Sequence, residues 1–293
     1  MPELPDIDVY IAALTNLIGG QRLTSVRVAS PFLVRSVTPP LATVENRTVT
    51  ALRRIGKRIA IGFDNDRWLV LHLMVAGRLQ WKNVRPSLAG KQLLAIFDFV
   101  PGSLILTEAG TKKRASLFVV TGEAGLTEHD PGGLEPLSSS YREFAAALRA
   151  ENHTLKRSLT DPSLLSGIGN AYSDEILHAA RLSPVLLTQR LDEDQMRRLY
   201  EATLETLHQW RDRLMHVAAG KMPKKVTAFR DGMAVHGRFG KPCPICGESV
   251  QRIRYKDSET NYCARCQTGS RILKDRSLSR LLKEDWPKTL DER

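Results

Sequence analysis

Short apolar runs separated by turn residues dominate the chain from Leu23 to about Val120. Asp64-Asn65-Asp66 and Pro101-Gly102 are two of the separators, and runs bounded in this way are typical of β-strands. Short strands at this spacing predict a β-sandwich or barrel. The expected strands are Leu23–Ala29, Val49–Ile55, Arg58–Phe63, Trp68–Met74, Gly77–Trp81, Leu93–Phe99, Ser103–Thr107 and Ser116–Val120.

A helix is expected in front of the strands. Pro5 suits the first turn of a helix, Asp6 and Asp8 favour its positive end, and Gly19-Gly20 can stop it.

The pattern changes after the last expected strand. Thr121 to Ser140 is rich in Gly, Pro and Ser, which predicts a linker. Beyond it, apolar residues recur at helical spacing, followed by a small cysteine-bearing module and a tail that could form a short docked helix around Ser277–Lys283. The expected helices are Tyr141–Ala150, His153–Thr160, Ala171–Ala180 and Asp192–Leu214.

The fold class expected from these patterns is α+β and multidomain. An N-terminal helix and β-sandwich occupy residues 1–125, and a linker occupies 126–140. A helical domain (141–234), a cysteine-bearing module (235–268) and a C-terminal tail (269–293) follow.

The net charge of the chain restricts the class of its binding partner. The 293-residue chain has a formal net charge of +11, which favours a polyanionic partner, with nucleic acid ahead of an anionic membrane surface. The first residues are acidic and proline-rich, unlike a signal peptide, and no apolar stretch is long enough for a membrane span. We therefore expect a cytoplasmic protein.

All four cysteines lie close together, as Cys243-Pro-Ile-Cys246 and Cys263-Ala-Arg-Cys266 with sixteen residues between the pairs. Each CxxC turn lets two thiolates reach one tetrahedral ion, so the spacing predicts one structural Zn²⁺ ion, against the alternatives of unligated thiols or a redox pair. Four protein ligands leave no open position on the metal.

The amino terminus offers a nucleophile. Removal of Met1 would leave the secondary amine of Pro2, and an α-amino group has a pKa of about 7.7–8.0, so it can attack a carbonyl carbon near neutrality. Glu3 would then supply a carboxyl group for proton transfer. The plain alternative is an ordinary helix start with prolines and acids in its first turn.

A second constellation consists of Lys156 and the turn Gly167-Ile168-Gly169-Asn170. A glycine-bounded turn before a helix presents backbone N–H groups to a phosphate, and the Asn170 amide could point to the same ligand. Alternatively, Asn170 is simply a helix N-cap.

In order along the chain, these segments resemble the Fpg/Nei family of DNA glycosylases, the formamidopyrimidine-DNA glycosylase and endonuclease VIII type. The resemblance runs from Pro2 to Cys266. The segments that carry it are Pro2-Glu3-Leu4-Pro5, Arg54-Ile55-Gly56-Lys57-Arg58, His72-Leu73 before Gly77, Gly167-Ile168-Gly169-Asn170, and Val235-His236-Gly237-Arg238 leading into Cys243.

This resemblance implies a base-excision-repair glycosylase with apurinic/apyrimidinic (AP) lyase activity, acting as a monomer on damaged double-stranded DNA in the nucleoid. Residues 1–125 would be its catalytic domain, 141–234 a helix–two-turns–helix DNA-binding domain, and 235–268 a zinc finger. Pro2 would attack C1′ of a nucleotide carrying an oxidised or ring-opened base and form a Schiff base, after which β,δ-elimination cuts the strand. Glu3 would assist proton transfer.

The resemblance also implies DNA contacts. Lys57 belongs to the catalytic set and, with His72, would bind phosphates around the flipped nucleotide. Lys156 and Asn170 would bind phosphates from the helical domain. Alone, Lys57 could be a solvated strand-edge lysine and His72 a core histidine.

A base flipped out of the duplex leaves a void that the protein fills. The chain departs from the family at the residues expected to fill it. Val75 stands at the usual Met position, and Met74 lies one residue early, which in a strand reverses the face. The segment Thr107–Arg114 has no aromatic residue, Ser258 replaces the usual finger arginine, and residues 220–226 differ from the glycine-rich lesion loop. Two rivals therefore remain, a damaged-DNA-binding zinc protein without catalysis and a zinc-ribbon accessory factor for RNA or transcription.

Overall fold

The computed structural model describes residues 1–255, 258–275 and 287–292. The chain forms two compact units, each built from two segments. Unit 1 comprises Met1–Pro131 and Trp210–Thr227, and unit 2 comprises Gly132–Gln209 and Ala228–Arg293. Trp210–Thr227, which the sequence assigned to the helical domain, thus clusters with unit 1.

Unit 1 begins with helix α1 (Leu4–Ile18), which confirms the expected N-terminal helix. Glu3 is its N-cap residue, and the backbone N–H of Glu3 donates to Asp6 Oδ2 at 2.9 Å. One face of the helix packs into the main hydrophobic core because its apolar residues recur every three or four positions. These buried residues are Ile7, Tyr10, Leu14 and Ile18.

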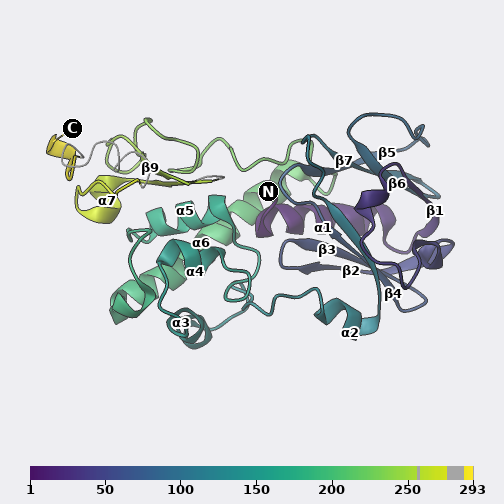
Figure 1. Cartoon of the computed structure of the whole chain (residues 1–293), viewed down its shortest axis with the longest axis horizontal. Helices are drawn as coiled ribbons and strands as arrows, with labels where there is room; N and C mark the ends of the chain where they lie inside the picture. Colours follow the sequence, from purple (N-terminus) through teal and green to yellow (C-terminus); the bar gives the residue numbers. More distant parts are fainter. Residues whose placement is uncertain (256–257, 276–286, 293) are drawn as a thin grey trace. The chain divides into compact units, whose positions relative to one another are not determined.

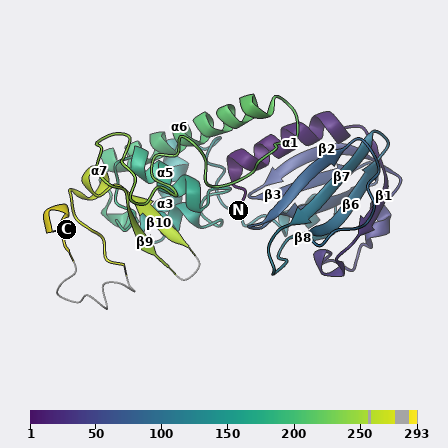
Figure 2. The same cartoon turned by 90° about the horizontal axis from the view of Figure 1, so that it is seen from above.

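Eight antiparallel strands form the β-sandwich of unit 1, as the sequence predicted (Figure 2). The strand order is β5-β7-β6-β1-β2-β3-β4-β8, and the short pairing of β1 with β2 at Arg22↔Thr48 and Leu23↔Arg47 joins the two halves. The strands are β1 (Arg22–Val28), β2 (Arg47–Ile55), β3 (Arg58–Phe63), β4 (Arg67–His72), β5 (Gly77–Lys82), β6 (Leu93–Phe99), β7 (Gly102–Glu108) and β8 (Ser116–Thr121). Short 3₁₀ turns follow β1, at Pro31–Leu33 and Leu41–Val44.

The segment expected to be an irregular linker contains helix α2 (Gly122–Thr127). The glycines of this segment were interpreted as a sign of irregular structure. A Cβ on Gly125 would lie 2.8 Å from Val120 Cβ, so this glycine permits close packing of α2 on β8.

Unit 2 contains the expected helices. Helices α3 (Tyr141–Arg149) and α4 (Leu155–Thr160) precede α5 (Asn170–Ala179), which lies against the cysteine module (Figure 1). The long helix α6 (Glu193–Ala218) follows Asp192, whose side chain accepts the N–H of Gln195 at 2.8 Å. Its residues up to Gln209 belong to unit 2, and those from Trp210 on belong to unit 1. A short 3₁₀ turn, Thr188–Arg190, precedes α6.

The cysteine module is a hairpin of β9 (Gln251–Arg254) and β10 (Glu259–Tyr262) followed by α7 (Ala264–Thr268). The described parts of the tail cover this hairpin, where Leu273 and Leu290 pack on Ile253, Tyr262 and Ala264. Residues 290–292 form a last 3₁₀ turn. The tail helix expected at Ser277–Lys283 lies outside the described residues.

Within the described ranges, no helix combines the length and apolar character needed to cross a bilayer.

Candidate functional site

The predicted site residues divide between the two units. In unit 1 the amino terminus is enclosed, with Pro2 and Glu3 both buried. Burial lowers the pKa of the Met1 α-amino group below its ordinary value; the charges of Arg78 and Lys57 lower it further, while Glu3 and Asp6 oppose this. The structure therefore brings the amino terminus, Glu3 and Lys57 into one electrostatic neighbourhood.

Lys57 lies in the two-residue turn between β2 and β3, next to Gly56 with φ +56°. A positive φ at the first turn residue is what a tight hairpin requires. Lys57 is thus a turn residue rather than a strand-edge residue.

His72 is the last residue of β4 and pairs with Arg58 and Ser116 on the neighbouring strands. Burial, with the positive charges of Arg58 and Lys57, lowers the pKa of His72 to about 4. The imidazole is therefore uncharged at neutral pH. Its buried Nε2 has no hydrogen-bond partner among the described residues, and such an atom usually has a ligand, a water or a strain to explain it.

Arg78 is a residue that sequence reasoning missed. Its guanidinium donates to the carbonyl oxygens of Gly77 at 2.6 Å, Val226 at 2.9 Å and Val75 at 3.1 Å. It thereby holds the turn before β5 while placing a positive charge near the amino terminus. Its position directly after the His72–Gly77 segment was the available signal.

The expectation that strand alternation sets the faces of Met74 and Val75 is wrong, because both lie in the turn between β4 and β5. Strand β4 ends at His72, so strand alternation does not decide which way Met74 and Val75 point. Met74 takes a left-handed conformation with φ +52°. Val75 stands at the turn with 58 % of its surface exposed.

The loop between β7 and β8 carries basic residues in place of the expected aromatic residue, and the buried Glu108 carboxylate binds its backbone. Glu108 is 1 % exposed, and its carboxylate accepts the N–H groups of Arg114 at 2.9 Å and Ala115 at 3.2 Å. The Lys113 ammonium donates to the Glu108 carbonyl oxygen. Lys112 and Arg114 are exposed.

In unit 2, Lys156 lies inside the helical domain. Its ammonium donates to Asn170 O at 2.8 Å, Ser173 Oγ at 2.8 Å and Asp174 Oδ1 at 2.5 Å. These three acceptors match the three donors of an ammonium group. A DNA phosphate would have to replace one of them.

Asn170 is the first residue of α5, and Gly169 is the N-cap, so the N-cap alternative for Asn170 is wrong. Its Nδ2 donates to Glu259 O of β10 at 3.0 Å, which uses one of the two N–H donors on that atom. The turn before it depends on Gly167, with φ +78°.

Sequence reasoning also missed a buried polar network between α5 and the cysteine module. Asp174 Oδ2 accepts from His236 Nδ1 at 2.8 Å and from the N–H of Asn261 at 3.1 Å. Glu175 accepts the consecutive N–H groups of residues 234, 235 and 236 at 2.6, 2.9 and 2.9 Å. Asp174 and Glu175 lie shortly after the Gly167–Asn170 turn, but these partners lie about sixty to ninety residues away in the sequence.

The four cysteines meet as predicted. Their Sγ atoms all lie within 4.8 Å of one another, with 3.9 Å between Cys243 and Cys266 and 3.4 Å between Cys246 and Cys263. A tetrahedral site with metal–sulfur bonds of about 2.3 Å has sulfur–sulfur edges of about 3.8 Å. The cluster therefore fits Zn²⁺ and leaves no open coordination position.

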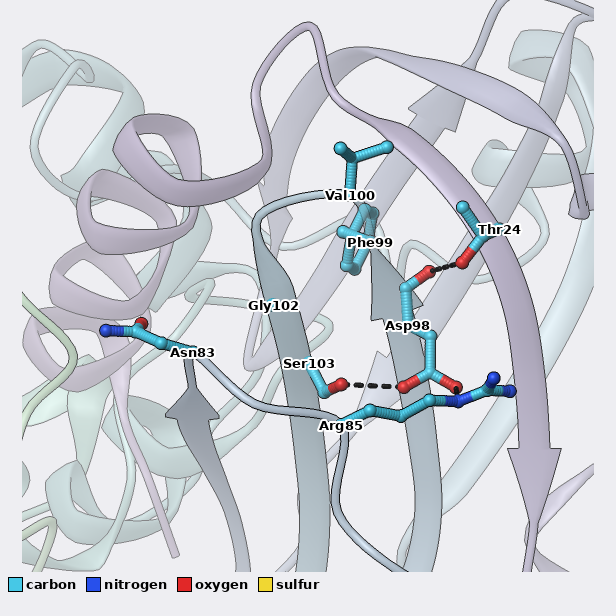
Figure 3. Close-up of a pocket in the computed structure, with 8 residues that line it drawn as sticks. All are labelled: Thr24, Asn83, Arg85, Asp98, Phe99, Val100, Gly102 and Ser103. Atoms are coloured by element: carbon cyan, nitrogen blue, oxygen red, sulfur yellow. Dashed lines mark hydrogen bonds and ion pairs between the residues drawn. The ribbon is translucent and has the colours of Figure 1, made fainter.

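A small polar pocket in the β-sandwich lies around Asp98 (Figure 3). Although burial raises the pKa of Asp98, hydrogen bonds from Arg27, Ser103 and Ser25 lower it to about 2. Arg27 donates through two nitrogens, at 2.6 and 3.0 Å. Because these partners belong to the sandwich itself, the group stabilises the fold and is not a candidate reaction centre.

Three family models match the chain. "Formamidopyrimidine-DNA glycosylase N-terminal domain" matches residues 1–112, "Formamidopyrimidine-DNA glycosylase H2TH domain" matches 133–210, and "Zinc finger found in FPG and IleRS" matches 240–269.

Among curated proteins, the chain is 32 % identical over 290 residues to the formamidopyrimidine-DNA glycosylase of Heliobacterium modesticaldum, covering 91 % of this chain and 100 % of that one. It is 38 % identical over 160 residues to an uncharacterized formamidopyrimidine-DNA glycosylase-like protein of Mycobacterium tuberculosis, covering 55 % of this chain and 99 % of that one.

Among solved structures, the fold is similar to that of Lactococcus lactis Fpg in complex with abasic-site DNA, with a TM-score of 0.80 and 23 % identity over 91 % of this chain and 99 % of that one. A second complex of the same protein, with DNA containing an oxidised pyrimidine, gives 0.81 and 25 % over 91 % and 100 %.

Proposed function

Because this chain belongs to the formamidopyrimidine-DNA glycosylase family, we propose that it is a base-excision-repair DNA glycosylase with AP lyase activity. Its substrate is damaged duplex DNA, and its place is the cytoplasm with the nucleoid. The net charge of +11 supports a polyanionic partner, and binding through phosphates makes the affinity fall steeply with salt.

Pro2 is the proposed nucleophile once Met1 is removed. Its nitrogen lone pair forms a bond to C1′ while the bond from C1′ to the damaged base breaks, and the base leaves with that electron pair and a proton. The enclosed site supports this role: burial lowers the pKa of the Met1 α-amino group, and Pro2, whose amine is exposed to reaction once Met1 is removed, is itself buried.

Glu3 is the proposed proton donor and acceptor at the sugar. Protonation of the sugar ring oxygen opens the ring and gives the iminium, which acidifies C2′. Loss of a C2′ proton expels the 3′ phosphate, and a second elimination expels the 5′ phosphate. The buried position of Glu3 beside Pro2 supports this assignment.

Lys57 and His72 are the proposed phosphate ligands in unit 1. Lys57 brings a positive charge to the neighbourhood of the amino terminus. His72 is uncharged at neutral pH, so its contact is a hydrogen bond from an imidazole N–H rather than an ion pair. The unpartnered Nε2 supports that contact.

In unit 2, the second N–H of Asn170 Nδ2 is the proposed phosphate donor. Lys156 adds positive charge behind the turn and contacts a phosphate by exchanging one of its three acceptors. One Zn²⁺ ion bound by Cys243, Cys246, Cys263 and Cys266 is structural and stabilises the finger.

The observation that carries the proposal is the buried amino terminus beside Glu3 and Lys57 in a chain of this family. The test is cleavage of a duplex with one abasic site, compared with a duplex carrying a ring-opened purine. The wild type should leave phosphates at both ends of the gap, and Glu3→Gln should lower the rate by at least about a hundredfold, the usual contribution of acid–base catalysis.

The control is Glu123→Gln, which alters an exposed carboxylate paired with Arg53. It should cleave at the wild-type rate. Salt-sensitive binding without cleavage of either duplex would contradict the proposed enzyme and favour a damaged-DNA-binding protein, the alternative suggested by the small Val75 and the loop that lacks an aromatic residue.

A further inference from the structure

Three polar residues of α5 are spaced four apart, at positions 170, 174 and 178. Residues with this spacing lie on one face of a helix, and here each contacts the cysteine module. Asn170 bonds Glu259 O, Asp174 bonds the N–H of Asn261, and His178 Nε2 lies 3.2 Å from Cys243 Sγ. The last contact joins the helix to a sulfur of the cluster itself.

His178 is enclosed at this contact. It is 2 % exposed and Cys243 is also 2 % exposed, so water does not compete for the sulfur. A neutral imidazole carries one N–H, and a thiolate that binds a metal accepts hydrogen bonds. With Nε2 as the protonated nitrogen, the contact is therefore an N–H···S hydrogen bond.

We propose that His178 is a positioning residue for the metal site, which donates its Nε2–H to the Cys243 thiolate and thereby retains the Zn²⁺ ion and fixes the finger to α5. Groups that hydrogen-bond to metal ligands orient those ligands and tune the metal, and their removal commonly costs about 10- to 100-fold in metal affinity. The proposal rests on the zinc site proposed above.

The arrangement has a consequence for the DNA-binding turn. His178 lies eight residues after Asn170 on the same helix, about 12 Å along its axis. Both ends of the contact face of α5 are thus attached to the cysteine module, one through the metal ligand Cys243 and the other through the proposed phosphate ligand Asn170.

The test measures zinc retention by the purified full-length protein. Zn²⁺ transfer to excess chelator is followed with a colorimetric zinc indicator for the wild type, His178→Phe and His178→Gln. The Phe variant keeps an aromatic ring but loses the donor, so it should lose zinc at least about tenfold faster. The Gln variant, whose Nε2 can occupy the position of the imidazole Nε2, should retain zinc nearly as the wild type does.

A matched control is His216→Phe, which makes the same change at an exposed position of α6 in the other unit. It should release zinc at the wild-type rate. If His178→Phe does not fold, His178→Asn, which is polar but too short to reach the sulfur, takes its place and should also release zinc faster.

A spectroscopic readout separates hydrogen bonding from packing. In Co²⁺-substituted protein, the thiolate-to-metal charge-transfer band should move to longer wavelength in His178→Phe and stay in place in His178→Gln. Equal release and equal spectra for the wild type and both variants would overturn the proposal, and so would equal loss in both. If the wild-type protein contains no zinc at all, the proposed zinc site itself fails.

Discussion

The Lys156 ammonium and the Asp174 carboxylate lie 2.5 Å apart, and only 13 % of the Lys156 side chain and none of the Asp174 side chain is exposed. The other oxygen of Asp174 binds His236 and the backbone of Asn261. One carboxylate therefore joins α4, α5 and the cysteine module.

Replacing this carboxylate should destabilise unit 2. In Asp174→Asn the buried ammonium faces a neutral amide, and breaking a buried pair typically costs about 3–5 kcal/mol. Urea unfolding followed by circular dichroism should show this loss. Asp212→Asn, at an exposed pair with Arg211, should cost about 1 kcal/mol or less. Equal losses in the two variants would contradict the role given to Asp174.

Glu108 should control the order of the cationic loop after β7. Glu108→Ala removes the acceptor for the N–H groups of Arg114 and Ala115, and each unsatisfied buried N–H costs about 1–3 kcal/mol. Limited trypsin digestion at Lys112, Lys113 and Arg114 should therefore become faster. Glu123→Ala, at an exposed pair, is the control and should leave the digestion rate unchanged. Unchanged digestion in Glu108→Ala would show that this carboxylate does not hold the loop.

Protonation of His72 should lower the free energy of unfolding in mild acid. Its pKa is about 4 in the folded protein and about 6.5 when unfolded, so the unfolded chain binds more protons between these values. The stability from neutral His72 is present above pH 6.5 and is lost as the pH falls toward 4.

The measurement compares the free energy of unfolding of the wild type and His72→Gln at pH 7.5 and pH 4.5. The difference in favour of the wild type should shrink in acid, because the variant lacks this protonation. His216→Gln, at an exposed position, should give a difference that does not change with pH. A His72→Gln difference that is constant with pH would exclude a depressed pKa at this site.

The tail residues 271–275 and 287–292 should stabilise the finger. Leu273 and Leu290 cover Tyr262, and the Tyr262 hydroxyl accepts the N–H of Leu273 at 2.7 Å. Asp275, 1 % exposed, accepts the N–H of Arg254 at 2.6 Å. Full burial of one leucine contributes about 1.5–3 kcal/mol, and two partly buried leucines together with the two hydrogen bonds reach a similar size, so deletion of residues 271–293 should speed amide exchange in β9 and β10 by about tenfold.

The control for the deletion is Asp291→Ala, which changes an exposed tail residue. It should leave exchange in the hairpin unchanged. Amide exchange in the hairpin that is equally slow after deletion would show that the tail does not stabilise the finger.

The sequence predicted local structure well where one physical signal dominated. Short apolar runs between turn residues located the eight strands of unit 1, Pro5 and Gly19 bounded α1, and the cysteine spacing located the metal cluster. The helix α2 was missed because Gly125 was interpreted as a breaker, whereas its role is to let the helix approach Val120. That role depends on tertiary packing, which no local pattern carries.

The site was predictable to a similar extent. Motif residues such as Glu3 and Lys57 were identified by their order along the chain, and the structure places them near one amino terminus. The partners of Lys156 and His178 were not predicted, because the first depend on how α4 packs on α5 and the second on how α5 packs against the cysteine module. The four-residue spacing of 170, 174 and 178 was the one signal for the contact of α5 with that module.

Borohydride reduction of the protein mixed with abasic-site DNA, followed by mass spectrometry of the crosslinked peptide, shows which residue is the nucleophile. We expect an adduct on the peptide that begins at Pro2. The adduct should be weaker in Pro2→Gly, which puts a primary amine in place of the proline nitrogen. The adduct on Pro2 should be lost when one serine is added before Pro2, which locks the proline nitrogen in an amide, and kept in the matched control Pro5→Ala. An adduct elsewhere in the chain, or none with protein that has lost Met1, would contradict the role of Pro2 as the nucleophile.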